Sequence, residues 1–200
     1  TPDAPDFDPP ADVAGWGYGY VFQEANAARY QQLFEHARWV TIGWSLLAAL
    51  VAAAWALERS GSSAALVVLG LFALSPSLLA HGHLVTLDMP GVFGFLLTLY
   101  ANQRLLDRPG AGRAAALGAA LGLANLLKLS GSTLLLMVAA TWVVRMATER
   151  GHGPSAAAWA RIAWTTALTA LLVLNAGYGF DGTLAPLSQA TLSPGGTLAS

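Results

Sequence analysis

The sequence predicts an all-α, polytopic membrane protein, and three observations lead to that prediction. Of the 200 residues, 55% are hydrophobic and only 10% are charged, whereas soluble domains carry about 25% charged residues. The mean hydropathy is +0.52. The apolar residues form runs without charges, separated by short segments that contain Arg, Gly or Pro, as is typical of membrane helices joined by loops.

Six charge-free runs are the candidate membrane spans. They cover residues 39–57, 64–80, 89–103, 114–127, 129–144 and 162–177. A span needs roughly 20 residues, so polar neighbours must complete the shorter runs. One helix over 114–144 would leave Lys128 in mid-membrane at a cost of several kcal/mol, so we expect a turn there. Gly118 and Gly122 predict a close contact with a neighbouring helix, because small residues let membrane helices approach each other.

Basic residues predict which loops share a side of the membrane. Seven of the ten Lys and Arg residues fall in three alternate loops, near Arg59, over 104–113 and over 145–161. Loops rich in basic residues stay in the cytoplasm, so the turns over 81–88 and 128–130 are expected on the external face. Most acidic residues agree with this arrangement, being external in it: Asp3, Asp6, Asp8, Asp12, Glu24, Glu35, Asp88 and Asp181.

The spans divide the chain into three predicted regions. Residues 1–37 are expected to form an external loop with an interfacial helix, residues 38–180 a transmembrane helical domain, and residues 181–200 the start of an external loop. The interfacial helix is predicted over 20–40, where apolar residues recur among polar ones as in amphipathic helices. The Pro- and Asp-rich stretch 2–12 is predicted to be a solvated loop, because its prolines disturb the ligand spacing of a calcium site.

Composition also excludes several classes of site and partner. The chain has no cysteine, so it has neither a disulfide framework nor a thiolate metal site. A net charge of −1 argues against a nucleic-acid partner. The chain opens at Thr1 without a signal peptide and stops in a polar segment, and we interpret it as an internal piece of a longer protein.

The turn over 80–91 carries three polar residues, His81, His83 and Asp88, between apolar runs. The two histidines would point in different directions on a helix or a strand, so a shared metal needs further ligands; Asp88 is one candidate, and zinc or manganese would suit. Alternatively, His83 hydrogen-bonds a ligand or orients a carboxylate. Asp88 precedes an apolar run, where it either caps the helix, serves a functional role, or does both.

Two basic residues are candidates for binding a phosphate. Lys128 ends an apolar run, where its ammonium either reaches out to water or supplies a compact cation to a phosphate. Arg38, at the start of the first span, has the same two alternatives. Asn125 lies one turn before Lys128, within hydrogen-bonding range of the same region.

Three blocks of the sequence resemble the protein O-mannosyltransferases, polytopic glycosyltransferases of the GT-C type that use a polyprenyl-phosphate-linked sugar. The blocks are residues 75–101, 122–136 and 175–193. They follow the order of the family, and the third is similar to a bacterial branch of it. The resemblance implies that Asp88 matches an acidic residue of an external loop. It also implies that Lys128 matches a basic residue near the carrier phosphate, and Arg38 an arginine at the start of a membrane helix.

The resemblance implies transfer of a sugar from the lipid carrier to an acceptor, a protein or a lipid or glycan, at the external face of a bacterial inner membrane. Lys128 and Arg38 would stabilise the departing phosphate, and Asp88 and His83 would position the sugar or the acceptor. The family's catalytic acidic residue follows a membrane helix that this chain lacks before residue 39. We therefore expect the main base to be missing and the fragment alone to be inactive. A divalent metal is compatible with this pattern, but nothing in the sequence requires one.

Two other classes of protein stay open at this stage. A transporter binds its solute near the middle of the membrane, whereas the predicted spans are nearly free of charges. In a non-catalytic membrane scaffold, the external group of polar residues would be a coincidence.

Overall fold

The computed structural model describes residues 16–148 and 153–181. Within these residues every regular element is helical, which confirms the predicted all-α class. The elements are α1 (Trp16–Ala25), α2 (Tyr30–Ser60), α3 (Ser62–Leu74), α4 (Pro76–His83), α5 (Asp88–Asp107), α6 (Ala111–Leu127), the 3₁₀ helix η1 (Leu129–Ser132), α7 (Thr133–Thr148) and α8 (Ala156–Gly177).

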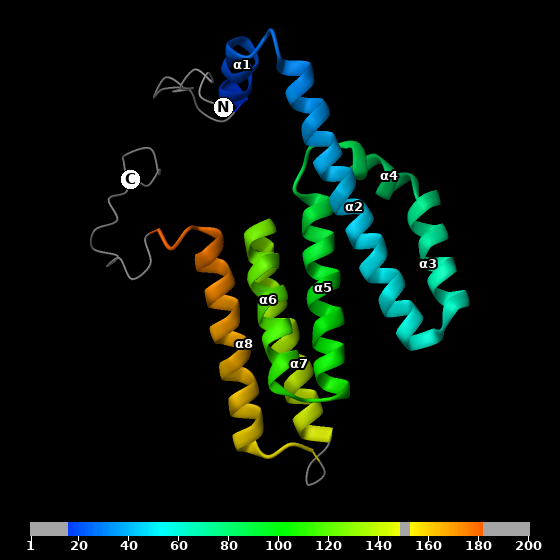
Figure 1. Ribbon diagram of the computed structural model, residues 1–200, viewed down its shortest axis with the longest axis vertical. Coiled ribbons are helices and arrows are strands. Elements are labelled where there is room, and N and C mark those ends of the chain that lie inside the picture. The colour runs from blue at the N-terminus through cyan, green and yellow to red at the C-terminus, as the bar shows by residue number, and fades with distance from the viewer. Residues whose placement is uncertain (1–15, 149–152, 182–200) are drawn as a thin grey trace.

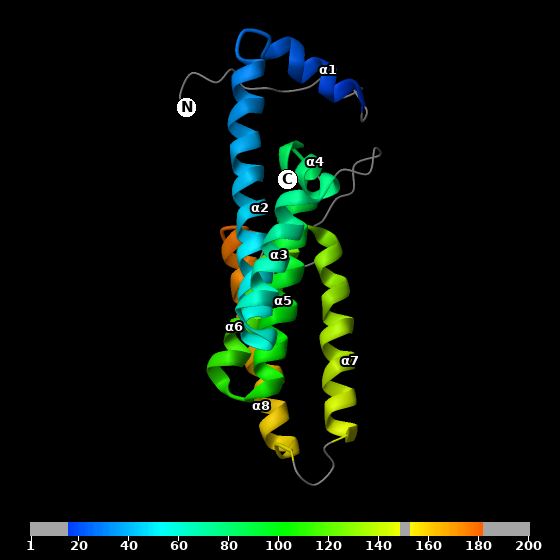
Figure 2. The same cartoon turned by 90° about the vertical axis from the view of Figure 1, so that its right-hand side faces the viewer.

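The long helices lie along one axis of the molecule, and the short helices α1 and α4 lie across it (Figures 1 and 2). By length and composition α2, α8 and the segment Leu129–Thr148 can each cross a membrane, and α3 with α4 forms a fourth candidate if the bent pair counts as one span. α6 is apolar but has only 17 residues. The chain is thus an integral membrane protein, although fewer helices meet this criterion than the six spans that the sequence predicts.

The outward faces of the long helices are apolar, as lipid requires. Exposed contiguous apolar surface of this kind is typical of contact with a membrane. Exposed large side chains include Leu46, Leu50, Leu66, Leu71, Leu136, Val144, Trp164 and Leu171. The surface therefore supports the assignment to the membrane class independently of helix length.

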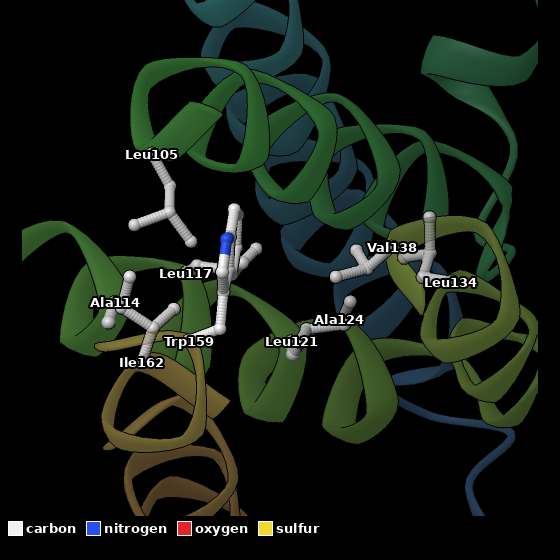
Figure 3. Close-up of a cluster of buried hydrophobic side chains, with 9 residues drawn as sticks. All are labelled: Leu105, Ala114, Leu117, Leu121, Ala124, Leu134, Val138, Trp159 and Ile162. Carbon is white, nitrogen blue, oxygen red and sulfur yellow. The ribbon is translucent and has the colours of Figure 1, made fainter. Parts of the chain in front are cut away.

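The buried core lies between α5, α6, α7 and α8 (Figure 3). Its members are Leu105, Ala114, Leu117, Leu121, Ala124, Leu134, Val138, Trp159 and Ile162. A buried polar residue ties α5 to α7: the Asn102 side chain donates to Thr141 Oγ1 at 3.0 Å and accepts from Trp142 Nε1 at 2.9 Å. These bonds satisfy the amide inside the bundle, where an unpaired polar group would be costly.

Small residues set the distance between α6 and α8, and the sequence predicts such a contact without identifying the neighbouring helix. A Cβ atom on Gly118 would collide with the backbone oxygen of Thr166, and one on Gly122 would lie 2.6 Å from the oxygen of Ala170. Only glycine fits at either position without moving a helix backbone. The predicted packing role of Gly118 and Gly122 is confirmed.

The prediction of a single interfacial helix over 20–40 is wrong. α1 ends at Ala25, and α2 begins at Tyr30 and continues without a break beyond Arg38. Local hydrogen bonds explain the interruption: the Asn26 side chain donates to the oxygen of Phe22 at 2.9 Å and accepts from Arg29 Nε at 3.1 Å. Asparagine competes in this way with the helix ladder.

The predicted domain boundary between residues 37 and 38 consequently lies inside α2. The predicted solvated loop over 2–12 lies outside the described residues, as does the predicted external segment after residue 181. The third block that resembles the mannosyltransferases is described only as far as residue 181.

The predicted span over 64–80 is two helices, because the chain bends by 61° between α3 and α4. Pro76 is the first residue of α4, and the Ser75 side chain accepts a hydrogen bond from the Leu78 amide at 3.4 Å. Serine as a cap followed by proline starts a new helix. α4 therefore crosses the end of the bundle close to the beginning of α5 (Figure 2).

Candidate functional site

Two helix ends meet where α5 starts and α6 finishes. The two helices are antiparallel neighbours, so Asp88, the first residue of α5, lies beside Lys128, which follows the last residue of α6 (Figure 1). A carboxylate is favoured at the amino end of a helix and a cation at the carboxyl end. The dipole of each helix therefore stabilises the charge at its end, in addition to the attraction between the two charges.

Three side chains lie close to the Asp88 carboxylate, those of Lys128, Thr86 and His81. We name these four residues the Asp88 cluster. Lys128 Nζ donates to Asp88 Oδ1 at 2.8 Å, and Thr86 Oγ1 donates to Asp88 Oδ2 at 3.3 Å. His81 Nδ1 lies 3.4 Å from the same Oδ2. The Asp88 and Lys128 side chains keep 43% and 38% of their exposure, so a ligand can reach both from solvent.

Glycines bring the two helix ends together. A Cβ atom on Gly91 would lie 3.0 Å from Lys128 Cδ, and one on Gly94 would lie 2.9 Å from Ala124 Cα. A Cβ atom on Gly131 would lie 2.6 Å from the Ala124 oxygen. The missing side chains let α5 touch α6 and let Lys128 lie across the first turn of α5.

Sequence reasoning missed Thr86 and the glycines Gly91, Gly94 and Gly131 as parts of this site. Gly91 and Gly94 stand three residues apart at the start of an apolar run, a spacing that also places two small residues on one face of a helix. Thr86 stands two residues before Asp88, a spacing at which a hydroxyl and a carboxylate bond locally.

Lys128 lowers the pKa of Asp88 below its ordinary value of 3.8, first through the hydrogen bond and then through its charge. Desolvation opposes this shift, whereas Thr86 and the charge of His81 add to it. Asp88 is consequently ionised at neutral pH and neutralises the charge of Lys128. A carboxylate with a lowered pKa is a poor general base at neutral pH.

The other candidate residues make no hydrogen bond to this cluster in the described part of the chain. His83 Nδ1 is 2.9 Å from the oxygen of Leu79 in its own helix, and the Asn125 side chain donates to the oxygen of Leu121 at 2.8 Å. Arg38 is exposed on α2. In the described part of the chain, the bonds and ion pairs of Asp88 reach none of these three residues.

Two alternatives for the turn can now be judged. Asp88 does not cap α5, because Leu87 holds the capping position and makes no side-chain capping bond. Among the described residues, no three His, Cys, Asp or Glu side chains are grouped so that they could hold a metal ion. The Lys128 ammonium also occupies one oxygen of Asp88. The donor set therefore does not fit a metal.

An apolar groove of about 380 Å³ lies between α2, α3 and α4. It is lined by Ile42, Ser45, Leu46, Ala49, Leu69, Phe72, Ala73, Leu78, Leu79, Gly82, His83 and Met89. Met89 follows Asp88 directly, so the groove begins next to the Asp88 cluster. We name it the outer groove, and its lining suits a hydrocarbon chain.

The opposite end of the bundle carries the other ion pairs of the described residues. Arg59 lies 3.1 Å from Asp107, and Arg104 lies 3.8 Å from Glu58. The α2–α3 and α5–α6 connections share this end with the end of α7 and the start of α8, whereas the start of α5 and the end of α6 lie at the other (Figure 1). Asp88 begins α5 and Lys128 follows α6, so the Asp88 cluster belongs to that other end. The alternation of loops that the basic residues predict agrees with this arrangement.

Comparison with known proteins identifies the family. The family model described as dolichyl-phosphate-mannose-protein mannosyltransferase matches residues 13–179. No curated protein and no solved structure matches the chain. The matched segment contains α1 to α8 together with the Asp88 cluster. The chain therefore belongs to the dolichyl-phosphate-mannose-protein mannosyltransferase family.

Proposed function

We propose that this chain forms the carrier-binding part of a glycosyltransferase that moves a sugar from a polyprenyl phosphate to an acceptor. The family supports glycosyl transfer of the mannosyltransferase kind. The pairing of Asp88 with Lys128 at 2.8 Å, next to an apolar groove, is the observation that carries the proposal. A lipid-linked sugar phosphate needs both a cation for its phosphate and an apolar surface for its chain.

Lys128 is the proposed contact of the carrier phosphate. Breaking the bond between sugar and phosphate develops negative charge on the phosphate, and a fixed cation stabilises that charge. Before the carrier binds, Asp88 holds the Lys128 ammonium in place. Arg38, exposed on α2, is a second proposed cation, and the outer groove is the proposed site of the first isoprene units.

Asp88 is proposed to position groups rather than to remove a proton. Its lowered pKa makes it a weak base at neutral pH. It orients Lys128 directly, and with His81 it presents hydrogen-bonding groups to the sugar or the acceptor. His83, at the edge of the outer groove, and Asn125 are proposed to contact the carrier after it binds.

The proposed acceptor is a protein hydroxyl, as the description of the family suggests. We further propose that the protein lies in a bacterial inner membrane with the Asp88 cluster on the external face. The arginine-rich connections at the opposite end support this orientation, because basic loops stay in the cytoplasm. A transporter gains less support, because the described ion pairs lie at the two ends of the bundle rather than midway.

Replacing Lys128 in the full-length protein tests the proposal. With a radiolabelled polyprenyl-phosphate sugar, Lys128→Met is expected to lower the transfer rate about 100-fold, the usual cost of one electrostatic contact to a developing anion. Lys128→Arg retains the charge and is expected to recover part of the rate. The control Arg161→Met removes an exposed cation from α8. An unchanged rate in Lys128→Met would refute the phosphate contact, and solute counterflow without transfer would favour a transporter.

A further inference from the structure

A second groove lies between α5 and α6, at the end away from the Asp88 cluster. We name it the inner groove; its volume is about 500 Å³. The Tyr100 ring lines it together with small and branched side chains: Leu97, Ala101, Ala116, Ala119, Ala120 and Leu123. The alanines leave room for a long apolar group, because they fill little of the space between the helices.

Two arginines, Arg104 and Arg113, also line the inner groove. Arg104 stands two turns beyond Leu97 on α5, a rise of about 10 Å. Arg113 lies in the first turn of α6, and Leu123 nearly three turns further along. The groove therefore has a cationic end near the connection of α5 to α6 and an apolar end that reaches toward the middle of the bundle.

The two arginines are held in place and keep donors for another ligand. Arg113 Nη1 donates to the oxygen of Arg108 at 2.8 Å. Arg104 lies 5.5 Å from the centre of the Tyr100 ring and 3.8 Å from Glu58. A guanidinium has five donors in a planar fork that matches the oxygens of a phosphate. The contacts described above therefore leave most donors of Arg104 and of Arg113 unused.

The net positive charge near the connection of α5 to α6 favours the binding of an anion. Four arginines lie here, namely Arg59, Arg104, Arg108 and Arg113, against the two acids Glu58 and Asp107. Basic pockets between membrane helices on the cytoplasmic side bind the headgroups of anionic lipids. A singly charged phosphodiester with two acyl chains would meet both the positive charge and the apolar lining.

We propose that the inner groove binds an anionic phospholipid from the leaflet opposite the Asp88 cluster. The phosphodiester lies between Arg104 and Arg113, and one acyl chain lies along the alanines of α5 and α6. This lipid is neither the sugar carrier nor the acceptor, since its site is at the far end of the bundle. It anchors the α5–α6 pair in the inner leaflet.

Native mass spectrometry of the full-length protein tests the headgroup contact. The protein is mixed with phosphatidylglycerol or phosphatidylcholine in detergent, and bound lipid is counted. We expect preferential retention of phosphatidylglycerol, and about a fivefold lower affinity in Arg113→Gln, the effect of one arginine near an anionic lipid. The matched control is Arg161→Gln, which removes an exposed arginine of α8. Equal losses in the two variants, or equal retention of both lipids by the wild type, would overturn the proposal.

A second variant tests the apolar part of the groove without changing charge. Ala116 is exposed and lines the inner groove, so Ala116→Phe fills the groove without disturbing the buried core. We expect this variant to keep the wild-type melting temperature and to lose bound phosphatidylglycerol. Normal lipid retention by Ala116→Phe would show that no acyl chain lies in the groove. If the wild type retains no lipid, another part of the full-length protein covers this face and the proposal fails.

Discussion

At the scale of single residues, Asp88 joins the polar side chains at the end of the bundle where α5 begins. Its two oxygens accept hydrogen bonds from Lys128 and Thr86, and His81 Nδ1 lies 3.4 Å from one of them. The contact with Lys128 joins residues 40 positions apart, so a short local motif and a distant cation meet on one carboxylate. A substitution that removes the charge of Asp88 but keeps the shape of its side chain therefore tests the role of the charge alone.

Replacing Asp88 by asparagine removes the charge and keeps the shape. Asp88→Asn in the full-length protein is expected to abolish sugar transfer, because Lys128 loses the partner that orients it and the sugar or the acceptor loses the carboxylate proposed to position it. The transfer rate from a polyprenyl-phosphate sugar measures the effect. The control Asp181→Asn removes an exposed acid in the turn that follows α8. Wild-type activity in Asp88→Asn would remove Asp88 from the site.

The contribution of Asp88 to the stability of the fold is expected to fall when the pH is lowered. Its pKa in the folded protein lies below the ordinary value of 3.8, so its contribution is present above that value and is lost as the pH falls through the folded pKa. The difference in melting temperature between the wild type and Asp88→Asn should therefore be constant near neutral pH and shrink below about pH 4. A difference that grew on acidification would contradict the ion pair.

At the scale of the elements, contacts between glycine and backbone hold α5, α6 and α8 together. A Cβ atom at Gly94 would lie 2.9 Å from Ala124 Cα, whereas one at Gly70 of α3 would meet nothing within 4 Å. The same substitution should therefore have opposite effects at the two positions.

Gly94→Ala is expected to destabilise the protein by about 1–3 kcal/mol, since overpacking moves a helix backbone. Gly70→Ala, its matched control, should be neutral or stabilise by up to about 1 kcal/mol, because alanine loses less conformational entropy in a helix. Unfolding by denaturing detergent measures both. If the two variants unfold alike, α5 and α6 are not in backbone contact.

At the scale of the whole molecule, the polar ends of the bundle predict two sides of a membrane. These 200 residues contain no cysteine, so a single cysteine introduced among them is the one label site in this part of the protein. In intact cells an impermeant maleimide should label Ser130→Cys, near the Asp88 cluster, and spare Ala111→Cys, at the start of α6. Permeabilised cells should show labelling of both. The reverse pattern in intact cells would invert the proposed orientation.

Much of this arrangement could be predicted from the sequence, because its signals are strong and local. Charge-free runs predict the positions of the helices, and the arginines in alternate loops predict which helix ends lie on the same side of the membrane. Lys128 breaks the run over 114–144 as expected, since α6 stops at Leu127 and α7 starts at Thr133. The meeting of Asp88 with Lys128 could not be predicted, because it depends on which helices become neighbours.

Other features depend on weaker signals. Asn26 interrupts the predicted helix over 20–40 through two hydrogen bonds that apolar periodicity does not contain. Ser75 and Pro76 bend the span over 64–80, although Pro within an apolar run could have been used to predict a break. Arg38, His83 and Asn125 share a face with the Asp88 cluster in the sequence prediction, yet the structure gives no bond that joins them to Asp88.

The pairing of Asp88 with Lys128 also bears on how the protein enters the membrane. The two residues flank one helical hairpin, α5 and α6. During synthesis this hairpin is complete before α7 and α8 exist, and its opposite charges can neutralise each other as soon as the two helices meet. The Asp88 and Lys128 side chains therefore have a partner of opposite charge before any later helix is made. The ion pair between Asp88 and Lys128 can thus form as an early step of insertion, before the rest of the bundle assembles.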